Sequence, residues 1–187
     1  MKSIISFVLI IMFLTTIGSV YGQSVFKDYK GNLVEFQYPI EWESAMTEGL
    51  DIKGIVLEDT HIPKDNRIAF DIPNTKGAFT VLIKDSDKKN LEELLQEVIQ
   101  SYSGTEDLLG IKQQILEITD TTLSNEPAKK LIVNSEESDN KQFRIINIIT
   151  LHDNKEYSIT YLMEAPSYDN YIPTIEKIIQ SFKFTQN

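Results

Sequence analysis

The sequence contains no cysteine, and it has only two histidines and one tryptophan among its 187 residues. The absence of cysteine excludes a disulfide framework, which an exported chain could otherwise use, and it also excludes a lipoprotein-type modified cysteine. Hydrophobic residues nevertheless make up 41% of the chain, so the composition is not that of a disordered protein. We therefore expect one medium-sized domain whose stability comes from buried apolar side chains.

The common catalytic motifs are also missing. The sequence has no Gly-x-Ser-x-Gly, no glycine-rich phosphate loop and no His-Glu-x-x-His. His61 and His152 could be grouped on paper with serine and aspartate residues, but such a set is defined by geometry and not by sequence. His152 is adequately explained as a turn residue. We predict that the protein is not an enzyme.

Basic residues are scarce relative to acidic ones. The chain has 18 lysines and arginines against 28 aspartates and glutamates, which gives a formal net charge of −10. The acidic residues are spread along the chain rather than collected in a tail. A dispersed negative field keeps a domain soluble and disfavours binding to nucleic acid or to anionic membranes. We therefore expect no nucleic-acid partner.

The longest apolar run lies at the N-terminus. Met1-Lys2 is followed by an uncharged stretch from Ile4 to Val20, and Gly22 is a small residue just before Gln23. A basic start, an apolar middle and a small residue at the end are typical of a secretory signal, although the run also approaches the length of an uncleaved membrane anchor. We expect a signal peptide or N-terminal anchor over residues 1–22 and one domain over residues 23–187. Residues 1–22 contain Lys2 and no acid, so that domain has a formal net charge of −11. We expect it to be secreted or to lie on the extracytoplasmic side of the membrane. It would contact the membrane only through an uncleaved leader.

The rest of the chain predicts strands separated by turn residues. Pro39 cannot donate to a strand ladder, so a strand ends there and Trp42 is expected to fold back over the sheet. Phe143–Leu151 is mostly apolar at both sets of alternate positions, which places it near the middle of a sheet, and Asn154 suits the left-handed conformation of a tight hairpin. We expect a turn over 123–128 and a polar loop over 135–140. The expected strands are residues 25–30, 33–38, 52–58, 67–72, 78–84, 111–121, 129–134 and the two strands of the 143–163 hairpin.

Two helices are predicted from apolar residues at helical spacing. The first covers Leu91–Tyr102, with Asn90 and Glu93 as a capping pair and Gly104 as its natural end. Its opposite face is expected to be solvated. The second covers Tyr168–Phe182 and is expected to pack on the hairpin before it. This order predicts an α+β fold, with one antiparallel β-sheet sandwiched between a helix on each side (α-β-α).

Several short motifs occur in an order that resembles the PsbP-like domain family over roughly residues 25–184. They are Tyr38-Pro39-Ile40-Glu41-Trp42, the helix Leu91–Tyr102, Pro127-Ala128, Lys155-Glu156-Tyr157, Tyr168-Asp169-Asn170-Tyr171-Ile172-Pro173 and Ser181-Phe182. The sequence departs from the family pattern where a glycine often precedes the Trp or the Pro-Ala and where the hairpin turn often contains Asn-Gly or Asp-Gly. Glu41, Glu126 and Asp153-Asn154 stand at those places, and they bear on turn geometry and subfamily rather than on the core.

The resemblance implies an α-β-α sandwich of the Mog1/PsbP type and a non-enzymatic role. Photosynthetic members of the family are extrinsic lumenal subunits of photosystem II that help to retain calcium and chloride. A distant group with the same fold binds the GTPase Ran in the nucleus. Many prokaryotic members are exported proteins, and the leader of this chain agrees best with that group.

Metal binding is a second hypothesis. Asp59 and His61 lie on the same side of Glu58-Asp59-Thr60-His61 if that segment is extended, and they could form half of a site for zinc or another divalent ion. A solvated strand end followed by Ile62-Pro63 is the better explanation of these two residues, because no second cluster has matching spacing. Glu136, Glu137 and Asp139 could collect calcium, but an exposed acidic loop also explains them. No other cofactor is expected.

A calcium loop is also suggested just before the first helix. Asp85, Asp87 and Asn90 resemble the first half of such a loop, but the glycine of its tight turn is missing and Gln96 stands where the bidentate glutamate should be. Acidic residues before a helix also favour the helix dipole.

Two functions remain open. One is a binding or assembly module outside the cytoplasm, which docks on a membrane complex or on another exported protein through loops and a sheet edge. The other is a secreted protein that binds a divalent cation or a small ligand.

Overall fold

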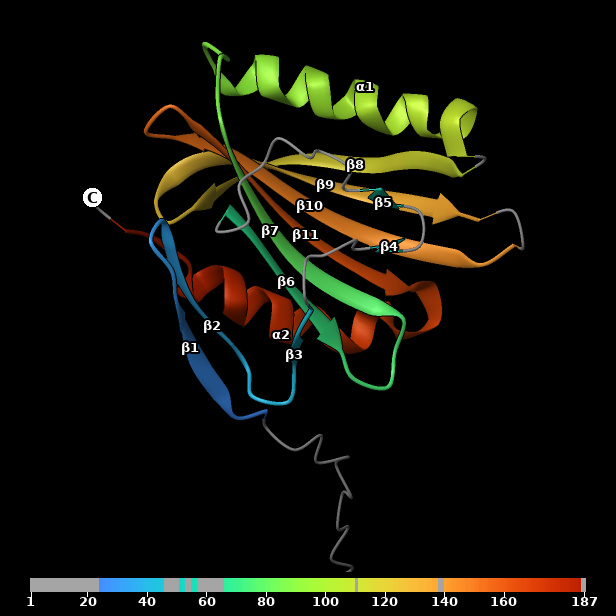
Figure 1. Cartoon of the computed structure of the whole chain (residues 1–187). Coiled ribbons are helices and arrows are strands. Elements are labelled where there is room, and N and C mark those ends of the chain that lie inside the picture. The colour runs from blue at the N-terminus through green and yellow to red at the C-terminus, as the bar shows by residue number, and fades with distance from the viewer. Residues whose placement is uncertain are drawn as a thin grey trace, which may run out of the picture.

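The computed structural model describes residues 24–45, 51–52, 55–56, 66–109, 111–137 and 140–185. The fold is mostly antiparallel β-structure with two helices (Figure 1). The largest sheet has seven strands in the order β3-β6-β7-β11-β10-β9-β8. Its strands are β3 (Glu43–Ser44), β6 (Arg67–Ile72), β7 (Gly77–Asp85), β8 (Lys112–Leu123), β9 (Glu126–Glu136), β10 (Gln142–His152) and β11 (Lys155–Glu164).

The β10–β11 hairpin lies in the middle of the seven-stranded sheet, as its two apolar faces predict. Its turn is Asp153-Asn154, and both residues have positive φ values of 47° and 56°, the backbone that a two-residue hairpin with right-handed strand twist requires. The same arrangement occurs at Ser124-Asn125, with φ values of 51° and 70°. The expected turn over 123–128 is therefore too long, because β8 and β9 extend up to these two residues. Likewise, β9 continues to Glu136, inside the expected loop over 135–140.

The first hairpin belongs to a separate sheet, which corrects the expectation of a single one. β1 (Phe26–Lys30) pairs with β2 (Val34–Pro39), and β2 also pairs with β12 (Lys183–Phe184) at the end of the chain. A third sheet pairs β4 (Asp51–Ile52) with β5 (Ile55–Val56). The single strand expected over 52–58 is thus wrong, because Ile52 lies opposite Ile55 in an antiparallel hairpin.

The first helix, α1 (Leu91–Leu109), begins as predicted and ends later than predicted. The backbone N–H of Glu93 donates to Oδ1 of Asn90 at 3.0 Å, and the N–H of Lys89 donates to Oε2 of Glu93 at 3.0 Å. The helix then runs through Gly104. A glycine inside a helix costs only about 1 kcal/mol, and the apolar pattern resumes after it with Leu108-Leu109. After β11, the short 3-10 helix η2 (Ala165–Ser167) leads into α2 (Tyr168–Ser181).

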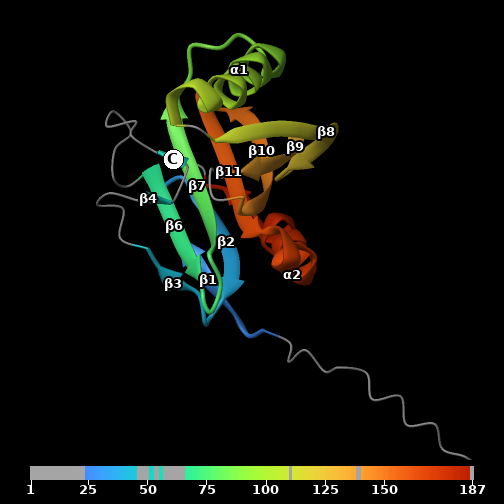
Figure 2. The same ribbon diagram turned by 90° about the vertical axis from the view of Figure 1, so that its right-hand side faces the viewer.

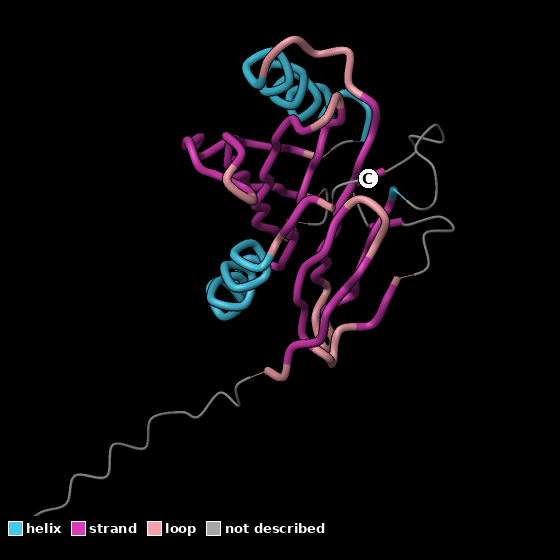
Figure 3. Tube along the Cα trace, turned by 90° about the vertical axis from the view of Figure 1, so that its left-hand side faces the viewer, coloured by secondary structure: helices cyan, strands magenta, loops and turns pink. Residues whose placement is uncertain are grey.

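The two helices pack into separate buried clusters on opposite faces of the large sheet (Figures 2 and 3). Ile145 and Ile149 of β10 lie in the cluster with α1, whereas Ile146 and Ile148 lie in the cluster with α2. This is the alternation that a strand covered on both faces must have. Each helix covers only part of its face, and the three-stranded sheet covers another part, so the fold is less simple than one sheet between two helix layers.

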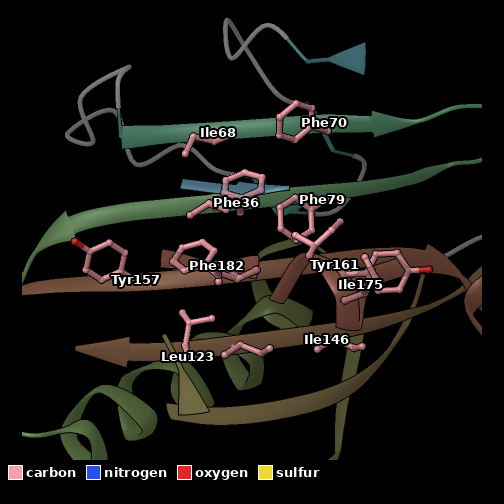
Figure 4. Close-up of a cluster of buried hydrophobic side chains, with 14 of the residues drawn as sticks. Phe36, Ile68, Phe70, Phe79, Leu123, Ile146, Tyr157, Tyr161, Ile175 and Phe182 are labelled. Carbon is pink, nitrogen blue, oxygen red and sulfur yellow. The ribbon is translucent and has the colours of Figure 1, made fainter. Parts of the chain in front are cut away.

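The larger cluster joins the two sheets and α2 through aromatic side chains (Figure 4). Phe36 of β2 stacks on Phe182 with ring centroids 5.7 Å apart, and its ring lies 5.8 Å from that of Phe79 of β7. Trp42 is 2% exposed and lies 5.9 Å from the same Phe79 ring. The prediction that Trp42 folds back over the sheet after Pro39 is therefore confirmed.

Candidate functional site

The outer edge of β8 is the longest open strand edge in the part of the chain that the structure describes. β8 has 12 residues and pairs only with β9, whereas the other end of the same sheet is formed by the two residues of β3. Figure 1 shows β8 beneath α1 at the margin of the sheet. Native proteins usually shorten or cover such edges, because unpaired backbone groups can pair with another chain.

Exposed apolar side chains accompany this edge. Leu116 is 45% exposed and Ile118 is 40% exposed, and the other large apolar residues exposed to this degree among the described residues are Val25 and Ile40. The register between β8 and β9 shifts between Ile115 and Glu117, so Leu116 has no partner on β9. A bulge of this kind re-aims a side chain, and here the residue without a partner is a leucine.

Acidic side chains line the same margin. Glu117 and Asp120 are exposed residues of β8. Lys129 of β9 lies 2.8 Å from Oδ1 of Asp120 and 3.6 Å from Oε2 of Glu92 on α1. The hydrogen bond to Asp120 raises the pKa of Lys129 above its ordinary value. Glu117 has no such ion pair among the described residues, and Lys130 lies opposite Thr119 on β9. Glu92, Glu117 and Asp120 therefore outnumber Lys129 and Lys130, and the margin keeps a small excess of negative charge.

A hollow of about 370 Å³ lies where β1, β2 and β12 meet the end of α2. The backbone N–H of Gln37 donates to Oγ of Ser181 at 2.8 Å, and Nε2 of Gln37 donates to Oδ1 of Asp28 at 3.1 Å. Charges of both signs are present, because Lys30 and Lys183 lie opposite Glu35 on its two neighbouring strands. The lining residues are Asp28, Tyr29, Lys30, Glu35, Phe36, Gln37, Ser181 and Lys183. The hollow is wide enough for a small polar ligand.

The contacts of His152 hold neighbouring strands together. Its Nδ1 lies 3.2 Å from Oε1 of Glu126, and its Nε2 lies 3.4 Å from Oδ2 of Asp153. Its ring stacks on Phe184 with centroids 4.2 Å apart and an interplanar angle of 11°. His152 thus connects the hairpin end to the C-terminal strand.

The predicted metal ligands Asp59 and His61 lie outside the described residues. Of the acidic loop, Glu136 ends β9 and Glu137 follows it, whereas Asp139 is again outside the described residues. Within the described ranges, no three or more histidine, aspartate and glutamate side chains are grouped in a way that could hold a metal ion.

The residues of the suggested calcium loop have other partners. Oδ1 of Asp85 lies 2.5 Å from Nζ of Lys155, and Oδ1 of Asp87 lies 2.7 Å from Nζ of Lys88. Asn90 caps α1 through its side-chain oxygen. Each of the three residues thus has a different partner: Asp85 pairs with Lys155 of β11, Asp87 with the adjacent Lys88, and only Asn90 holds the start of the helix.

A cluster of charged residues that the sequence does not predict ties α1 to the large sheet. Glu156 of β11 is 4% exposed and accepts a hydrogen bond from Oγ of Ser86 at 2.9 Å. Lys84 lies 2.9 Å from Glu156 and 3.1 Å from Glu97 of α1, and Lys88 lies 2.7 Å from the other oxygen of Glu97. Glu97 therefore does not simply face solvent as expected. Its hydrogen bond from Lys88 is the main reason that its pKa is lowered.

The pKa of Lys84 is raised above its ordinary value. Burial opposes the charged form and is the largest single influence, but the hydrogen bonds to Glu156 and Glu97 together outweigh it. Lys84 and Glu97 are therefore charged at neutral pH, and the cluster attaches α1 to the large sheet.

A family model described as PsbP-like protein matches residues 18–184 of the chain. No curated protein matches the sequence. No helix within the described residues is both long and apolar enough to cross a membrane.

Solved structures with the same fold come from a cyanobacterium, a mycobacterium and a yeast. Cyanobacterial PsbP (CyanoP) from Synechocystis sp. PCC 6803 has a TM-score of 0.63 and 13% identity, with 92% of this chain and 99% of that chain covered. LpqN of Mycobacterium tuberculosis, described as involved in cell envelope biogenesis, has a TM-score of 0.55 and 11% identity over 88% and 92% of the two chains. The Ran-binding protein Mog1p of Saccharomyces cerevisiae has a TM-score of 0.55 and 12% identity over 86% and 95%. At these identities the similarity shows the fold alone.

Proposed function

Because the chain belongs to the PsbP-like protein family, we propose that it is a non-enzymatic binding or assembly module that works outside the cytoplasm. Its partner is another protein, either part of a membrane complex or itself exported. The scaffold is the large antiparallel sheet, with α1 and α2 covering parts of its opposite faces. The names of two structural relatives support a role of this kind, since Mog1p is a Ran-binding protein and LpqN is involved in cell envelope biogenesis.

The observation that carries the proposal is the margin formed by β8. It combines 12 residues of strand that pair on one side only with two exposed apolar side chains, Leu116 and Ile118. Exposed apolar side chains on a rigid sheet are typical of protein interaction sites. A rigid surface also binds at a lower entropic cost than a loop.

Photo-crosslinking in cells that naturally make the protein tests this function. One variant carries a photo-reactive amino acid in place of Leu116, and a matched control carries it in place of Gln180, which is exposed on α2. We expect a discrete crosslinked product of defined mass from position 116 and none from position 180. The same products from both positions, or none from either position and none from reactive groups placed around the hollow, would contradict a specific binding role.

The extracytoplasmic location has its own test. Mass spectrometry of the mature protein is expected to find Gln23 as the first residue, with the domain outside the cytoplasm. A protein that keeps Met1 and stays in the cytoplasmic fraction would exclude both the signal peptide and the proposed location.

Binding of a divalent cation or a small ligand is the second candidate. The hollow between β1, β2, β12 and α2 favours a small ligand, and Asp59 with His61 remains the sequence hypothesis for calcium or zinc. A ligand at 100 times its Kd stabilises the folded state by about 2.7 kcal/mol. Thermal melts with and without millimolar Ca²⁺ and Zn²⁺ are therefore expected to shift clearly if either ion is bound, and the Asp59→Asn/His61→Gln variant should abolish that shift.

A further inference from the structure

We propose that the outer edge of β8 binds an extended, basic segment of the partner protein, which pairs with it as an eighth strand of the large sheet. This inference rests on the binding role proposed above and names the chemistry of the partner. Three features of the described residues support it: a long strand edge without a pairing partner, two apolar anchors and an excess of acidic side chains.

The edge is long enough and lacks most of the usual protection. Twelve residues at about 3.3 Å each give an edge of roughly 40 Å. Edge strands are normally protected by short length, by proline, by charged side chains (lysine above all) or by a bulge, and of these β8 has acidic side chains and one bulge. β1, the open edge of the small sheet, has five residues and carries Lys27 and Lys30. β8 contains no proline, and after Lys112 it contains no lysine.

The bulge leaves the edge usable on its C-terminal side. Register shifts occur only between Ile115 and Glu117, and the pairing from Glu117 to Leu123 is regular. A partner strand along this regular part would meet Ile118 and, at the bulge, Leu116. Main-chain hydrogen bonds supply affinity in strand addition, and side chains at alternate positions supply specificity.

The charged side chains along the outer edge of β8 indicate the charge of the segment that would bind there. Glu117 and Asp120 are exposed on β8, on opposite faces of the strand, and Glu92 of α1 lies near Asp120 through their shared contact with Lys129. These three carboxylates outnumber Lys129 and Lys130, the two lysines that β9 places opposite this part of β8, and the whole chain has a formal net charge of −10. Lysine or arginine side chains on the added strand would relieve this excess, whereas a second copy of this acidic chain would add to it. The occupant is therefore a basic segment of a different protein.

The test uses three synthetic ten-residue peptides and the purified protein. The first alternates valine or isoleucine with lysine, the second has glutamate in place of every lysine, and the third is the lysine peptide with N-methyl groups on alternate backbone amides. Binding is measured by fluorescence anisotropy, and its place is measured by hydrogen exchange of the amides of β8. We expect the lysine peptide to bind at least tenfold more tightly than the glutamate peptide and to slow exchange in β8. The N-methylated peptide should lose at least tenfold in affinity, because it cannot complete the ladder.

Matched variants of the protein separate local charge from total charge. Glu117→Lys/Asp120→Lys is expected to reverse the preference between the lysine and glutamate peptides. Glu41→Lys/Glu176→Lys makes the same change in net charge at two exposed residues away from β8 and should keep the original preference. Equal binding of both peptides, protection outside β8, or equal effects of the two double variants would overturn the inference.

Two further outcomes also overturn it. The first is a dimer in light scattering that Ile118→Lys abolishes, because the edge would then bind a second copy. The second is a partner crosslinked at position 116 in cells while no lysine peptide binds to β8. In that case the binding role stands and the strand-addition mechanism fails. If crosslinking also yields no partner at any position, the proposed function fails as well.

Discussion

Gly77 and Gly104 differ in the space around them for a side chain. A Cβ atom added at Gly77 would lie 2.3 Å from Cε and 2.8 Å from Sδ of Met163, a fully buried side chain. A Cβ atom added at Gly104 would meet no atom within 4 Å. The first glycine therefore lets β7 approach the side chain of a residue on β11, and the second only weakens α1.

Alanine substitutions at these two glycines are expected to change stability in opposite directions. Gly77→Ala should destabilise the protein by about 1–3 kcal/mol, because the core around Met163 would be overpacked. Gly104→Ala should stabilise it by about 0.5–1 kcal/mol, because alanine has the higher helix propensity. Urea denaturation followed by circular dichroism measures both. A destabilised Gly104→Ala would mean that α1 ends at Gly104, as the sequence alone predicts.

Asn147 is a polar residue inside the apolar cluster under α1. It is 6% exposed, its Nδ2 donates to the hydroxyl oxygen of Tyr102 at 3.0 Å, and its Oδ1 accepts from Oγ of Ser158 at 3.1 Å. Burial raises the pKa of Tyr102, so the phenol is neutral and can accept this hydrogen bond. Buried polar groups are costly when they lose a partner.

We therefore expect Tyr102→Phe to destabilise the protein by about 1–2 kcal/mol, because Nδ2 of Asn147 would stay buried without its acceptor. Tyr171→Phe is the matched control, since Tyr171 of α2 is half-buried and its hydroxyl has no hydrogen bond within the described part of the chain. The free energies of unfolding from urea titrations should differ between the two variants. Equal losses would show that the Tyr102 hydroxyl contributes nothing specific.

At the scale of elements, α1 is held to the sheet by charge as well as by apolar burial. Leu94 and Leu95 are buried in the cluster of β9, β10 and β11. At the same end of the helix, Glu97 bridges Lys84 of β7 and Lys88 of the preceding loop. Because Glu97 is partly exposed, solvent screens these contacts and their contribution is modest.

Stability is expected to fall in acid partly through this attachment. The folded-state pKa of Glu97 lies below its ordinary value of 4.5, chiefly because Lys88 donates a hydrogen bond to the carboxylate. The folded protein therefore binds this proton less readily than the unfolded chain, so the contribution is present above pH 4.5 and is lost as the pH falls through the folded-state value. Glu97→Gln should lower stability near neutral pH and have progressively less effect in acid.

Urea titrations between about pH 7 and about pH 3 measure this difference. Glu93→Gln is not a suitable control because Glu93 caps the helix, whereas Glu176→Gln removes an exposed carboxylate from α2. The stability difference caused by Glu97→Gln should shrink toward pH 3 by more than the difference caused by this control. Equal pH dependence of the two differences would refute the attachment by charge.

Several elements could be predicted from local sequence, and others depend on distant neighbours. Asn90 with Glu93 predicts the start of α1, and the two apolar faces of Phe143–Leu151 predict a central strand, because each signal lies within a few residues. The end of α1 could not be predicted, because a single glycine is only a weak local breaker and the helix continues through Gly104 to Leu109. The pairing of β12 with β2 could not be predicted either, because a two-residue strand has no periodicity.

From the sequence, the candidate site could be predicted only as a sheet edge, without the strand that forms it. A sheet edge was expected, but which strand forms it depends on the order of strands, and Leu116 and Ile118 look like core residues in the sequence. Their exposure follows from the place of β8 at the end of the sheet and from the bulge after Ile115. The charged cluster around Glu156 could not be predicted either, because Lys84, Glu97 and Glu156 come from three separate elements.

At the scale of the whole molecule, the C-terminal strand joins the two ends of the chain. β12 pairs with β2, and Oγ1 of Thr185 donates to the carbonyl oxygen of Asn32 at 2.6 Å. Phe184 stacks on His152 at 4.2 Å and lies 4.7 Å from the ring of Tyr157. The small sheet is therefore completed by residues from the end of the chain.

Phe184→Ala is expected to destabilise the protein by about 1–3 kcal/mol, because a half-buried aromatic ring loses its contacts with His152 and Tyr157. Ile40→Ala removes an apolar side chain that is 55% exposed and should change stability by no more than about 0.5 kcal/mol. Hydrogen exchange should also speed up in β2 for Phe184→Ala and not for Ile40→Ala. Unchanged exchange in β2 would mean that β12 does not support the small sheet.

Because β12 lies far along the sequence from the hairpin that it pairs with, its position also affects folding during translation. A ribosome releases the first hairpin early, but the strand that completes its sheet emerges much later, since Thr185 follows its partner Asn32 by 153 positions. Closing so long a loop is entropically unfavourable until the intervening core exists. The nascent chain therefore cannot fix its first hairpin against a third strand until residue 184 has been synthesised, and until then β2 has one edge without a pairing partner.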